Sequence, residues 1–231
     1  MSDSFNIKKI AEIRNGFSDK FGIPRQSGLC ETVKSQIIFE PEYRVAEAFK
    51  GLEGFSHIWL IWQFSEAVRS EWSPTVRPPR LGGNKRIGVF ATRSPFRPNS
   101  LGLSCVKLDK VEFTEDFGPV LHISGADLMD GTPIFDVKPY IPYADSKENA
   151  IDGFLSMAPR VFLNVSFEDC DISGIDPIII ENFKEIIAED PRPAYHNTPD
   201  RIYKMLYSGY EAEFLVEDGT AFVKRIYKEK K

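Results

Sequence analysis

The stretch LGLSCVKLDKVEFTEDFGPVLHIS, residues 101–124, decides the fold class of this chain. In residues 101–113 apolar and polar residues alternate over part of the stretch, and several side chains are β-branched or aromatic. This pattern is typical of a β-strand. Glu115-Asp116-Phe117-Gly118 has the composition of a tight turn, and residues 120–124 form a second apolar run. The stretch therefore predicts a β-hairpin.

Outward from this hairpin, further short segments predict strands because they alternate or are uniformly apolar, β-branched or aromatic. They are residues 6–14, 32–39, 55–64, 87–91 and 133–138. One helix is expected among them, over residues 41–50, where Pro41 occupies a first-turn position and Gly51 follows the last turn. Many strands with one helix predict a β-barrel or β-sandwich for residues 1–145.

The C-terminal part of the chain has a different pattern. It consists of a polar linker with a helical turn or two (144–157), a strand (161–167), an amphipathic helix (176–189) and an apolar hairpin around residues 218–219. Asp176-Pro177 is typical of a helix start, and Asp218-Gly219 is a strong two-residue turn signal. Residues 146–231 are therefore expected to form a small α+β unit.

The composition is that of a globular protein, since 42% of the 231 residues are hydrophobic and 27% are charged. The 29 basic and 34 acidic residues give a net charge of −5, which argues against a protein coated in positive charge but not against a local basic patch. Three cysteines are too few for a disulfide framework, and three scattered histidines do not have metal-ligand spacing. No apolar run is long enough for a bilayer span or a secretory signal, so we expect a cytoplasmic protein without metal.

Three common motifs are missing. The chain has no Gly-x-Gly fingerprint, no GxxxxGK[ST] phosphate loop and no Gly-x-Ser-x-Gly nucleophile elbow. The sequence therefore does not predict a Rossmann-type cofactor site, a P-loop or an α/β-hydrolase.

The densest chemical signal is basic. Residues 77–108 contain seven basic side chains and no acidic one, although the whole chain is acidic. The prolines of this stretch fix φ and remove hydrogen-bond donors, so rigid loops are expected. Arginines held on rigid loops suit bidentate binding of carboxylate or phosphate groups. The alternative is a proline-rich loop at the rim of a barrel with solvated arginines.

Other elements have related chemistry. Residues 22–26 repeat the combination of proline and arginine, and residues 190–195 place an arginine near a tyrosine, a pairing that grips phosphates and stacks bases. Asp127, Asp130 and Asp136 could accept hydrogen bonds from ribose hydroxyls or from an ammonium group. The alternatives are turn-stabilising aspartates and a loop that only docks two units together.

Taken together, these elements resemble one family. The matching segments are GIPRQSGL (22–29), GLEGFSHIWLI (51–61), PTVRPPRLGGNKRIGVFATRSPFRPNSLGLS (74–104), DLMDGTPIFDVKPYIPYAD (127–145) and DPRPAY (190–195). They resemble the TsaA-like β-barrel family, and within it the TrmO-type tRNA methyltransferases that act on N6-threonylcarbamoyladenosine. The resemblance implies methyl transfer from S-adenosylmethionine to N6 of this nucleoside, next to the anticodon of tRNA.

The resemblance also implies an organisation. The protein would be mainly β, with a TsaA-like barrel over residues 1–145 that binds the cofactor and a small α+β unit over residues 146–231 that recognises tRNA. It would form a homodimer with the cofactor near the interface. The absent Gly-x-Gly fingerprint agrees with a β-barrel methyltransferase, because the usual methyltransferase fold has a glycine-rich turn.

Carried over residue by residue, the resemblance implies a cofactor site and an RNA site. The cofactor residues would be Pro24, Arg25, Gln26, Ser65, Glu66, Arg93, Leu103, Asp130, Gly131, Thr132, Pro133, Asp136 and Lys138. The residues for the substrate and the tRNA would be Arg77, Arg80, Arg97, Asn99, Asp190, Arg192 and Tyr195. Family members often have His-Gln where this chain has Ser65-Glu66, so the role of that imidazole does not carry over.

Two chemical roles are hypotheses at this point. N6 carries a carbamoyl group and is a poor nucleophile, so we expect Asp130 or Asp136 to accept its proton. We expect one of Arg25, Arg77 and Arg80 to hold the threonyl carboxylate of the substrate.

The C-terminal unit is expected to hold the backbone of the anticodon stem-loop. The residues would be those of the 190–195 loop together with Lys224, Arg225 and Lys228, which predicts salt-sensitive binding. Two other functions stay open. One is a non-catalytic barrel that binds S-adenosylmethionine as an interaction module, and the other is a methyltransferase with a different substrate.

Overall fold

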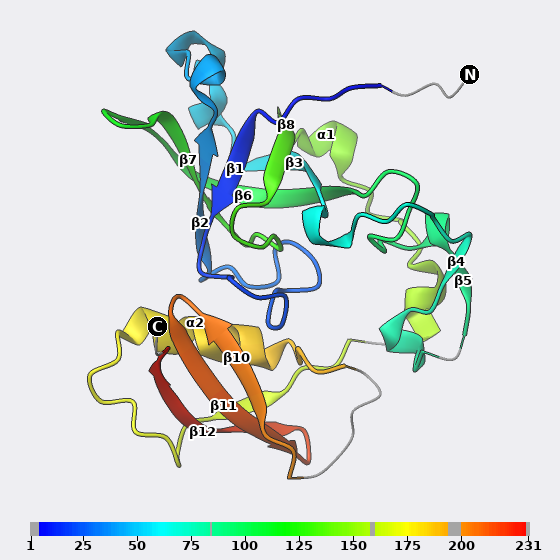
Figure 1. The fold of residues 1–231 in the computed structure, drawn as a ribbon, viewed down its shortest axis with the longest axis vertical. Helices are drawn as coiled ribbons and strands as arrows, with labels where there is room; N and C mark the ends of the chain where they lie inside the picture. The colour runs from blue at the N-terminus through cyan, green and yellow to red at the C-terminus, as the bar shows by residue number, and fades with distance from the viewer. Residues whose placement is uncertain (1–4, 84, 158–159, 194–199, 230–231) are drawn as a thin grey trace.

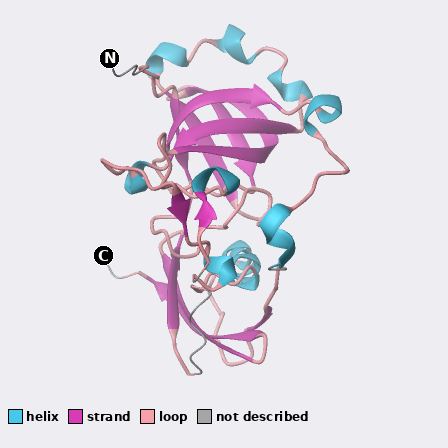
Figure 2. Cartoon of the chain, turned by 90° about the vertical axis from the view of Figure 1, so that its right-hand side faces the viewer, coloured by secondary structure: helices cyan, strands magenta, loops and turns pink. Residues whose placement is uncertain are grey.

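The computed structural model describes residues 5–83, 85–157, 160–193 and 200–229. A β-barrel and a smaller α+β unit lie one above the other, and an arm of short elements lies beside them (Figure 1). Figure 2 shows the same two bodies from the side, with short helical turns around the barrel. Within the described residues, none of the helices combines the length and apolar character that crossing a membrane requires.

The barrel is a closed sheet with the strand order β1-β2-β7-β6-β3-β8, in which every neighbouring pair is antiparallel. Its strands are β1 (Ala11–Arg14), β2 (Lys34–Phe39), β3 (His57–Gln63), β6 (Leu101–Thr114), β7 (Gly118–Ser124) and β8 (Pro133–Pro139). The mainly β fold class is confirmed. The predicted hairpin is β6–β7, and its turn places Gly118 at φ +62°, which glycine adopts without strain.

Alternate residues of these strands point inward and form one apolar core. It includes Ile13, Ile37, Ile58, Leu60, Val106, Leu121, Ile123 and Ile134, each at most 1% exposed. Trp62 joins this core from the end of β3 and pairs with Gly102 across the β3–β6 ladder. A Cβ at Gly102 would lie 2.2 Å from the Trp62 indole, so the missing side chain is what allows the ring to lie across the strand.

Gly102→Ala is expected to destabilise the barrel by about 1–3 kcal/mol, because the added methyl group overpacks a fixed aromatic ring. Urea denaturation of the two proteins measures the difference. Gly54→Ala is the matched control, since a Cβ at Gly54 meets no atom within 4 Å. Equal losses of stability in the two variants would show that the indole contact is not the cause.

The prediction of a helix over residues 41–50 is wrong. Its residues form two 3₁₀ turns, η1 (Pro41–Tyr43) and η2 (Ala46–Phe49), and Val45 between them is extended with φ −95° and ψ 115°. This break turns Phe49 into the barrel core, where it packs edge-to-face on a second phenylalanine with ring centroids 4.8 Å apart. Tertiary packing of the aromatic side chain has overridden local helix propensity.

Several expected strands are shorter than predicted, including the strand expected over residues 161–167, which spans only residues 164–166. β1 begins only at Ala11, because residues 5–9 are exposed and have no partner strand among the described residues. Of residues 87–91, only β5 (Ile87–Gly88) pairs, with β4 (Thr75–Val76), and η6 (Val89–Ala91) follows as a 3₁₀ turn. The other short elements are η3 (Leu52–Gly54), η4 (Ser65–Ala67), η5 (Pro79–Leu81), α1 (Pro142–Asp145) and η7 (Gly153–Met157).

The C-terminal unit is a sheet covered by one helix. Its elements are β9 (Asn164–Ser166), α2 (Pro177–Ala188), β10 (Tyr203–Tyr207), β11 (Tyr210–Glu217) and β12 (Thr220–Lys228). The strand order is β10-β11-β12-β9, with β9 parallel to β12. The predicted helix start is confirmed, since the Asp176 carboxylate accepts from the backbone N–H of Ile178 at 2.9 Å. The predicted Asp218-Gly219 hairpin is confirmed as well, with φ +45° and +76° at its two turn residues.

The loop between β1 and β2, residues 15–33, joins the two bodies, and we call it the bridging loop. Its Phe17, Cys30 and Val33 belong to the buried apolar cluster of the C-terminal unit, although they come from the N-terminal part of the chain. The Glu185 carboxylate on α2 accepts from the backbone N–H groups of Glu31 at 3.0 Å and Thr32 at 2.8 Å. The core of the smaller unit is therefore completed by a segment of the barrel half.

Candidate active site

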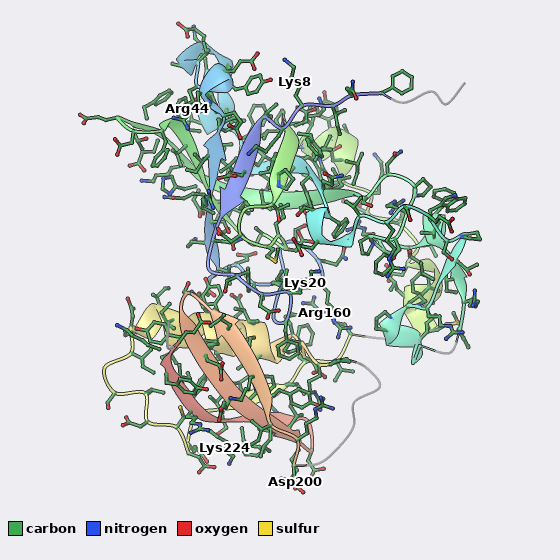
Figure 3. All side chains as sticks on the ribbon, in the orientation of Figure 1. Lys8, Lys20, Arg44, Arg160, Asp200 and Lys224 are labelled. Carbon is green, nitrogen blue, oxygen red and sulfur yellow. The ribbon has the colours of Figure 1, made fainter. Side chains whose placement is uncertain are left out.

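A cleft of about 1400 Å³ opens beside the bridging loop. Lys20 of this loop lines the cleft and lies between the two bodies in Figure 3. Most of the wall comes from residues 20–26, the end of β3 with η4, residues 90–99, the start of β6 and residues 127–132. These segments are distant in sequence, and barrel closure brings them together.

The structure gathers many of the predicted site residues in this cleft. The lining includes Pro24, Arg25, Gln26, Ser65, Glu66, Arg93, Arg97, Asn99, Leu103 and Thr132. Other predicted residues lie outside the described lining, namely Arg77, Asp130, Gly131, Pro133, Asp136, Lys138, Asp190 and Arg192. Tyr195 and the side chain of Arg80 lie outside the described residues.

The lining is predominantly cationic. Among the described residues it contains Lys20 and four arginines, against only two carboxylates, Glu66 and Asp127. Lys20 lies 3.8 Å from the Glu66 carboxylate and donates to the Glu66 carbonyl, which holds the η4 turn against the bridging loop. Glu66 of the Ser65-Glu66 pair therefore helps to hold this wall through both its carbonyl and its carboxylate.

The two carboxylates expected to accept a proton are held elsewhere. Asp130 lies 3.5 Å from the Arg14 guanidinium and accepts from the backbone N–H of Asn15 at 2.9 Å. Asp136 pairs with Lys138 at 2.9 Å on β8. Because each is engaged by a cation and neither belongs to the described lining, the geometry does not favour either as the proton acceptor.

Arg25 connects the cleft to the C-terminal unit. Its guanidinium donates to the backbone carbonyls of Asp190 at 3.3 Å and Arg192 at 2.7 Å. Arg192 itself forms a bidentate pair with the Asp190 carboxylate, with distances of 2.7 and 2.9 Å, and this pair raises the pKa of Arg192. The 190–192 loop thus reaches the cleft through Arg25, while its own side chains neutralise each other.

We call residues 69–99 the arginine arm, and three of its arginines are held in defined positions. Arg93 donates to the side-chain carbonyl of Gln26 across the cleft, and Arg97 donates to the Thr92 carbonyl at 3.3 Å. The Arg69 guanidinium lies 3.7 Å from the centre of the Phe96 ring. Fixed guanidinium groups of this kind suit a phosphate or carboxylate ligand.

Asp127 is a functional candidate that the sequence suggested as a hydrogen-bond acceptor but not as a cofactor residue or a proton acceptor. Its carboxylate lines the cleft and accepts from the Ser104 hydroxyl at 2.5 Å, and that hydroxyl accepts from the Trp62 indole at 2.9 Å. Burial raises the pKa of Asp127 from 3.8 to about 6, against the opposing effects of hydrogen bonds and of Arg93. The sequence places Asp127 in the same short motif as Asp130 but does not show which of the two faces the cleft.

The C-terminal cations expected to hold RNA have partners. Lys224 lies 2.6 Å from Asp169, and Arg225 lies 2.5 Å from Glu213. Lys228 lies over the ring of Tyr210. Lys224 lies in the part of this sheet that is away from the barrel in Figure 3. The cations that line the cleft come instead from the bridging loop, with Lys20 and Arg25, and from residues 69–97, with Arg69, Arg93 and Arg97.

Comparison with protein families matches two models to this chain. The tRNA-methyltransferase O N-terminal domain covers residues 12–146, and the TrmO C-terminal domain covers residues 177–229. The chain belongs to the TrmO family. The first match spans the strands of the barrel, and the second spans α2 and strands β10 to β12 of the α+β unit.

Curated relatives and solved structures of TrmO proteins extend the likeness over the whole chain. The tRNA (adenine(37)-N6)-methyltransferase of Escherichia coli K12 is 41% identical over 198 residues, which is 83% of this chain and 84% of that relative. The protein of the same name from Eikenella corrodens is 47% identical over 173 residues, covering 74% of this chain and 97% of the relative. A crystal structure of TrmO from P. aeruginosa aligns with a TM-score of 0.78 and 30% identity, covering 99% of each chain.

Proposed function

We propose that this protein is an S-adenosylmethionine-dependent methyltransferase that methylates N6 of N6-threonylcarbamoyladenosine beside the anticodon of tRNA. The observation that carries the proposal is the 41% identity, across both the barrel and the C-terminal unit, to a relative named tRNA (adenine(37)-N6)-methyltransferase. The cationic cleft beside the bridging loop supports it, because a nucleotide brings phosphate groups to such a site.

The cleft fits S-adenosylmethionine. Its volume of about 1400 Å³ exceeds the ~300–1,000 Å³ of most small-ligand pockets, so a cofactor and a nucleoside have room side by side. Leu103 and Met129 offer apolar surface to the adenine or methionyl part of the cofactor, and Arg93 offers a guanidinium to its carboxylate. Gln26 and Thr132 add neutral polar groups to the same wall.

When bound, the cofactor supplies an electrophilic methyl group on a positively charged sulfur. The residues of this chain then have two tasks, to align N6 with that group and to exclude water. Pro24, Phe96 and Pro98 form rigid apolar parts of the wall, and they suit both tasks. In our proposal the arginine arm holds the RNA backbone. One of Arg25, Arg77 and Arg80 holds the threonyl carboxylate, and of these Arg25 lines the cleft.

The two units divide the work in this proposal. Residues 1–145 hold the cofactor, and residues 146–231 help to select the RNA. The second role is supported by the contact of Arg25 with the 190–192 loop, because a tRNA that touches this loop lies next to the cleft.

The proposal includes a homodimer in the cytoplasm. Trp72 and Phe90 of the arginine arm are 50% and 72% exposed, with ring centroids 6.0 Å apart, and exposed aromatic pairs of this kind mark protein interfaces. A second copy of the chain on this surface would lie beside the cleft. All three cysteines are free thiols, as is usual in a reducing compartment.

Deletion of the gene from its host is expected to remove the N6-methylated form of threonylcarbamoyladenosine from tRNA while the unmethylated form accumulates. Mass analysis of tRNA nucleosides measures both forms, and return of the gene on a plasmid should restore the methylated one. An unchanged nucleoside profile would reject this substrate. Retained cofactor binding without methyl transfer to any tRNA would select the non-catalytic module instead.

A further inference from the structure

One carboxylate in the cleft is oriented by a chain of hydrogen bonds that starts in the barrel core. The indole N–H of Trp62 can only donate, so the Ser104 hydroxyl must accept it at 2.9 Å. The hydroxyl proton of Ser104 is then directed at Asp127 Oδ1, 2.5 Å away. Trp62 is 4% and Ser104 0% exposed, so water does not compete for these bonds.

The direction of these hydrogen bonds makes the Asp127 carboxylate an acceptor. Its carboxylate receives hydrogen bonds from Ser104 and from the backbone N–H groups of Ser27 and of Asp127 itself, and donors of this kind stabilise the ionised form. Arg93 is the charged side chain that acts on it. Among the described residues, no cation lies within 4.0 Å of the Asp127 carboxylate, the distance that would make an ion pair. Asp130 and Asp136 each have such a partner.

We infer that Asp127 accepts the N6 proton of the nucleoside during methyl transfer, a role that rests on the proposed function. The bond from N6 to the methyl carbon forms as the bond from that carbon to sulfur breaks, and the electron pair of the broken bond stays on sulfur. The N6–H bond breaks in the same process, and its proton goes to the Asp127 carboxylate. Charge is conserved, because the sulfonium becomes neutral as the carboxylate does.

The environment of Asp127 suits this task. Burial raises its pKa to about 6, so the group is ionised at neutral pH and is a stronger base than an exposed aspartate. A general base is most effective when its pKa lies near the working pH. Below pH 6 the carboxyl group is protonated and can no longer accept, so the rate is expected to fall there.

Asp127→Asn is the direct test. The amide keeps the shape and can still accept from Ser104 but cannot take the proton, so we expect the single-turnover rate on threonylcarbamoylated tRNA to fall about 100-fold or more. The affinity for S-adenosylmethionine, measured by calorimetry, should change less than about threefold. Asp109→Asn is the matched control, because Asp109 on the same barrel also accepts from a serine hydroxyl, that of Ser124, and does not line the cleft.

Ser104→Ala provides a second test with a readout that does not depend on turnover. Loss of the hydroxyl removes a bond that lowers the pKa of Asp127, so this pKa should rise. Titration of the Asp127 carboxyl by NMR in the cofactor-free protein should show the rise, and the acid limb of the rate profile should move to higher pH by the same amount.

The outcomes separate this inference from the proposed function. A wild-type protein that does not methylate the tRNA rejects the proposed function, and the role of Asp127 falls with it. Methylation by the wild type together with a near-normal rate in Asp127→Asn overturns the role of Asp127 alone. Lost cofactor affinity with a normal rate at saturating cofactor overturns it too, because Asp127 would then only bind the cofactor.

Discussion

Raising the salt concentration from about 50 to about 200 mM is expected to weaken tRNA binding roughly 100-fold, although the protein is acidic as a whole. The chain has a net charge of −5, but the cleft wall carries Lys20, Arg25, Arg69, Arg93 and Arg97. Each phosphate that they neutralise releases counterions, and about four such contacts give a loss of this size. Filter binding at a series of salt concentrations measures the slope.

Arg97→Gln should reduce this salt slope by about one and weaken binding similarly for all tRNAs, since a phosphate contact carries no sequence information. Lys8→Gln is the control, because Lys8 lies at the far end of the barrel in Figure 3 and pairs with Glu42 at 3.7 Å. A slope that is the same in wild type and Arg97→Gln would remove Arg97 from the RNA interface. Binding that is independent of salt would reject the cationic cleft as an RNA site.

Glu185→Ala is expected to weaken the binding of S-adenosylmethionine about tenfold, although Glu185 lies on α2 of the C-terminal unit and does not line the cleft. Its carboxylate accepts two backbone N–H groups of the bridging loop, at Glu31 and Thr32. Hydrogen bonds to a charged group stabilise by about 1.5–3 kcal/mol, and 1.4 kcal/mol corresponds to a tenfold change in affinity. The same loop carries cleft residues 24–26. Without the Glu185 hydrogen bonds, a smaller fraction of the molecules has this loop in the position that binds the cofactor.

Glu181→Ala is the matched control for this variant. It removes the same residue type from the same helix one turn earlier, but Glu181 contacts only Lys184, at 3.8 Å, among the described ion pairs. Calorimetric titration of both variants gives the comparison. Equal affinities would show that the C-terminal unit does not support the cofactor site, and the bridging loop would then be only a structural connection.

The strands of the barrel could be predicted from the sequence because their alternation is a local signal. The period of two in β6, the turn before Gly118 and the apolar run of β7 are all contained in one short stretch. The Asp218-Gly219 hairpin was predictable for the same reason. β10 was missed, although Ser208-Gly209, with φ +50° and +73°, forms a turn of the same kind before β11.

The features that the sequence did not reveal depend on contacts between distant segments. Residues 41–50 have helix-like composition, and only the insertion of Phe49 into the barrel breaks them into two turns. The sequence motif does not distinguish Asp127 from Asp130. In the folded barrel, Asp127 lies next to Ser104 and Asp130 lies next to Arg14. The engagement of Arg25 by the 190–192 loop likewise joins residues that are far apart in the chain.

Transfer of a methyl group from S-adenosylmethionine by the purified protein tests the central claim most directly. Two tRNA substrates of identical sequence are compared, one with N6-threonylcarbamoyladenosine and one with plain adenosine beside the anticodon. Mass analysis should find one added methyl group, on N6 of the threonylcarbamoylated nucleoside, and none on the unmodified tRNA. Equal methylation of both tRNAs, or cofactor binding with no methylation of either, would contradict the account.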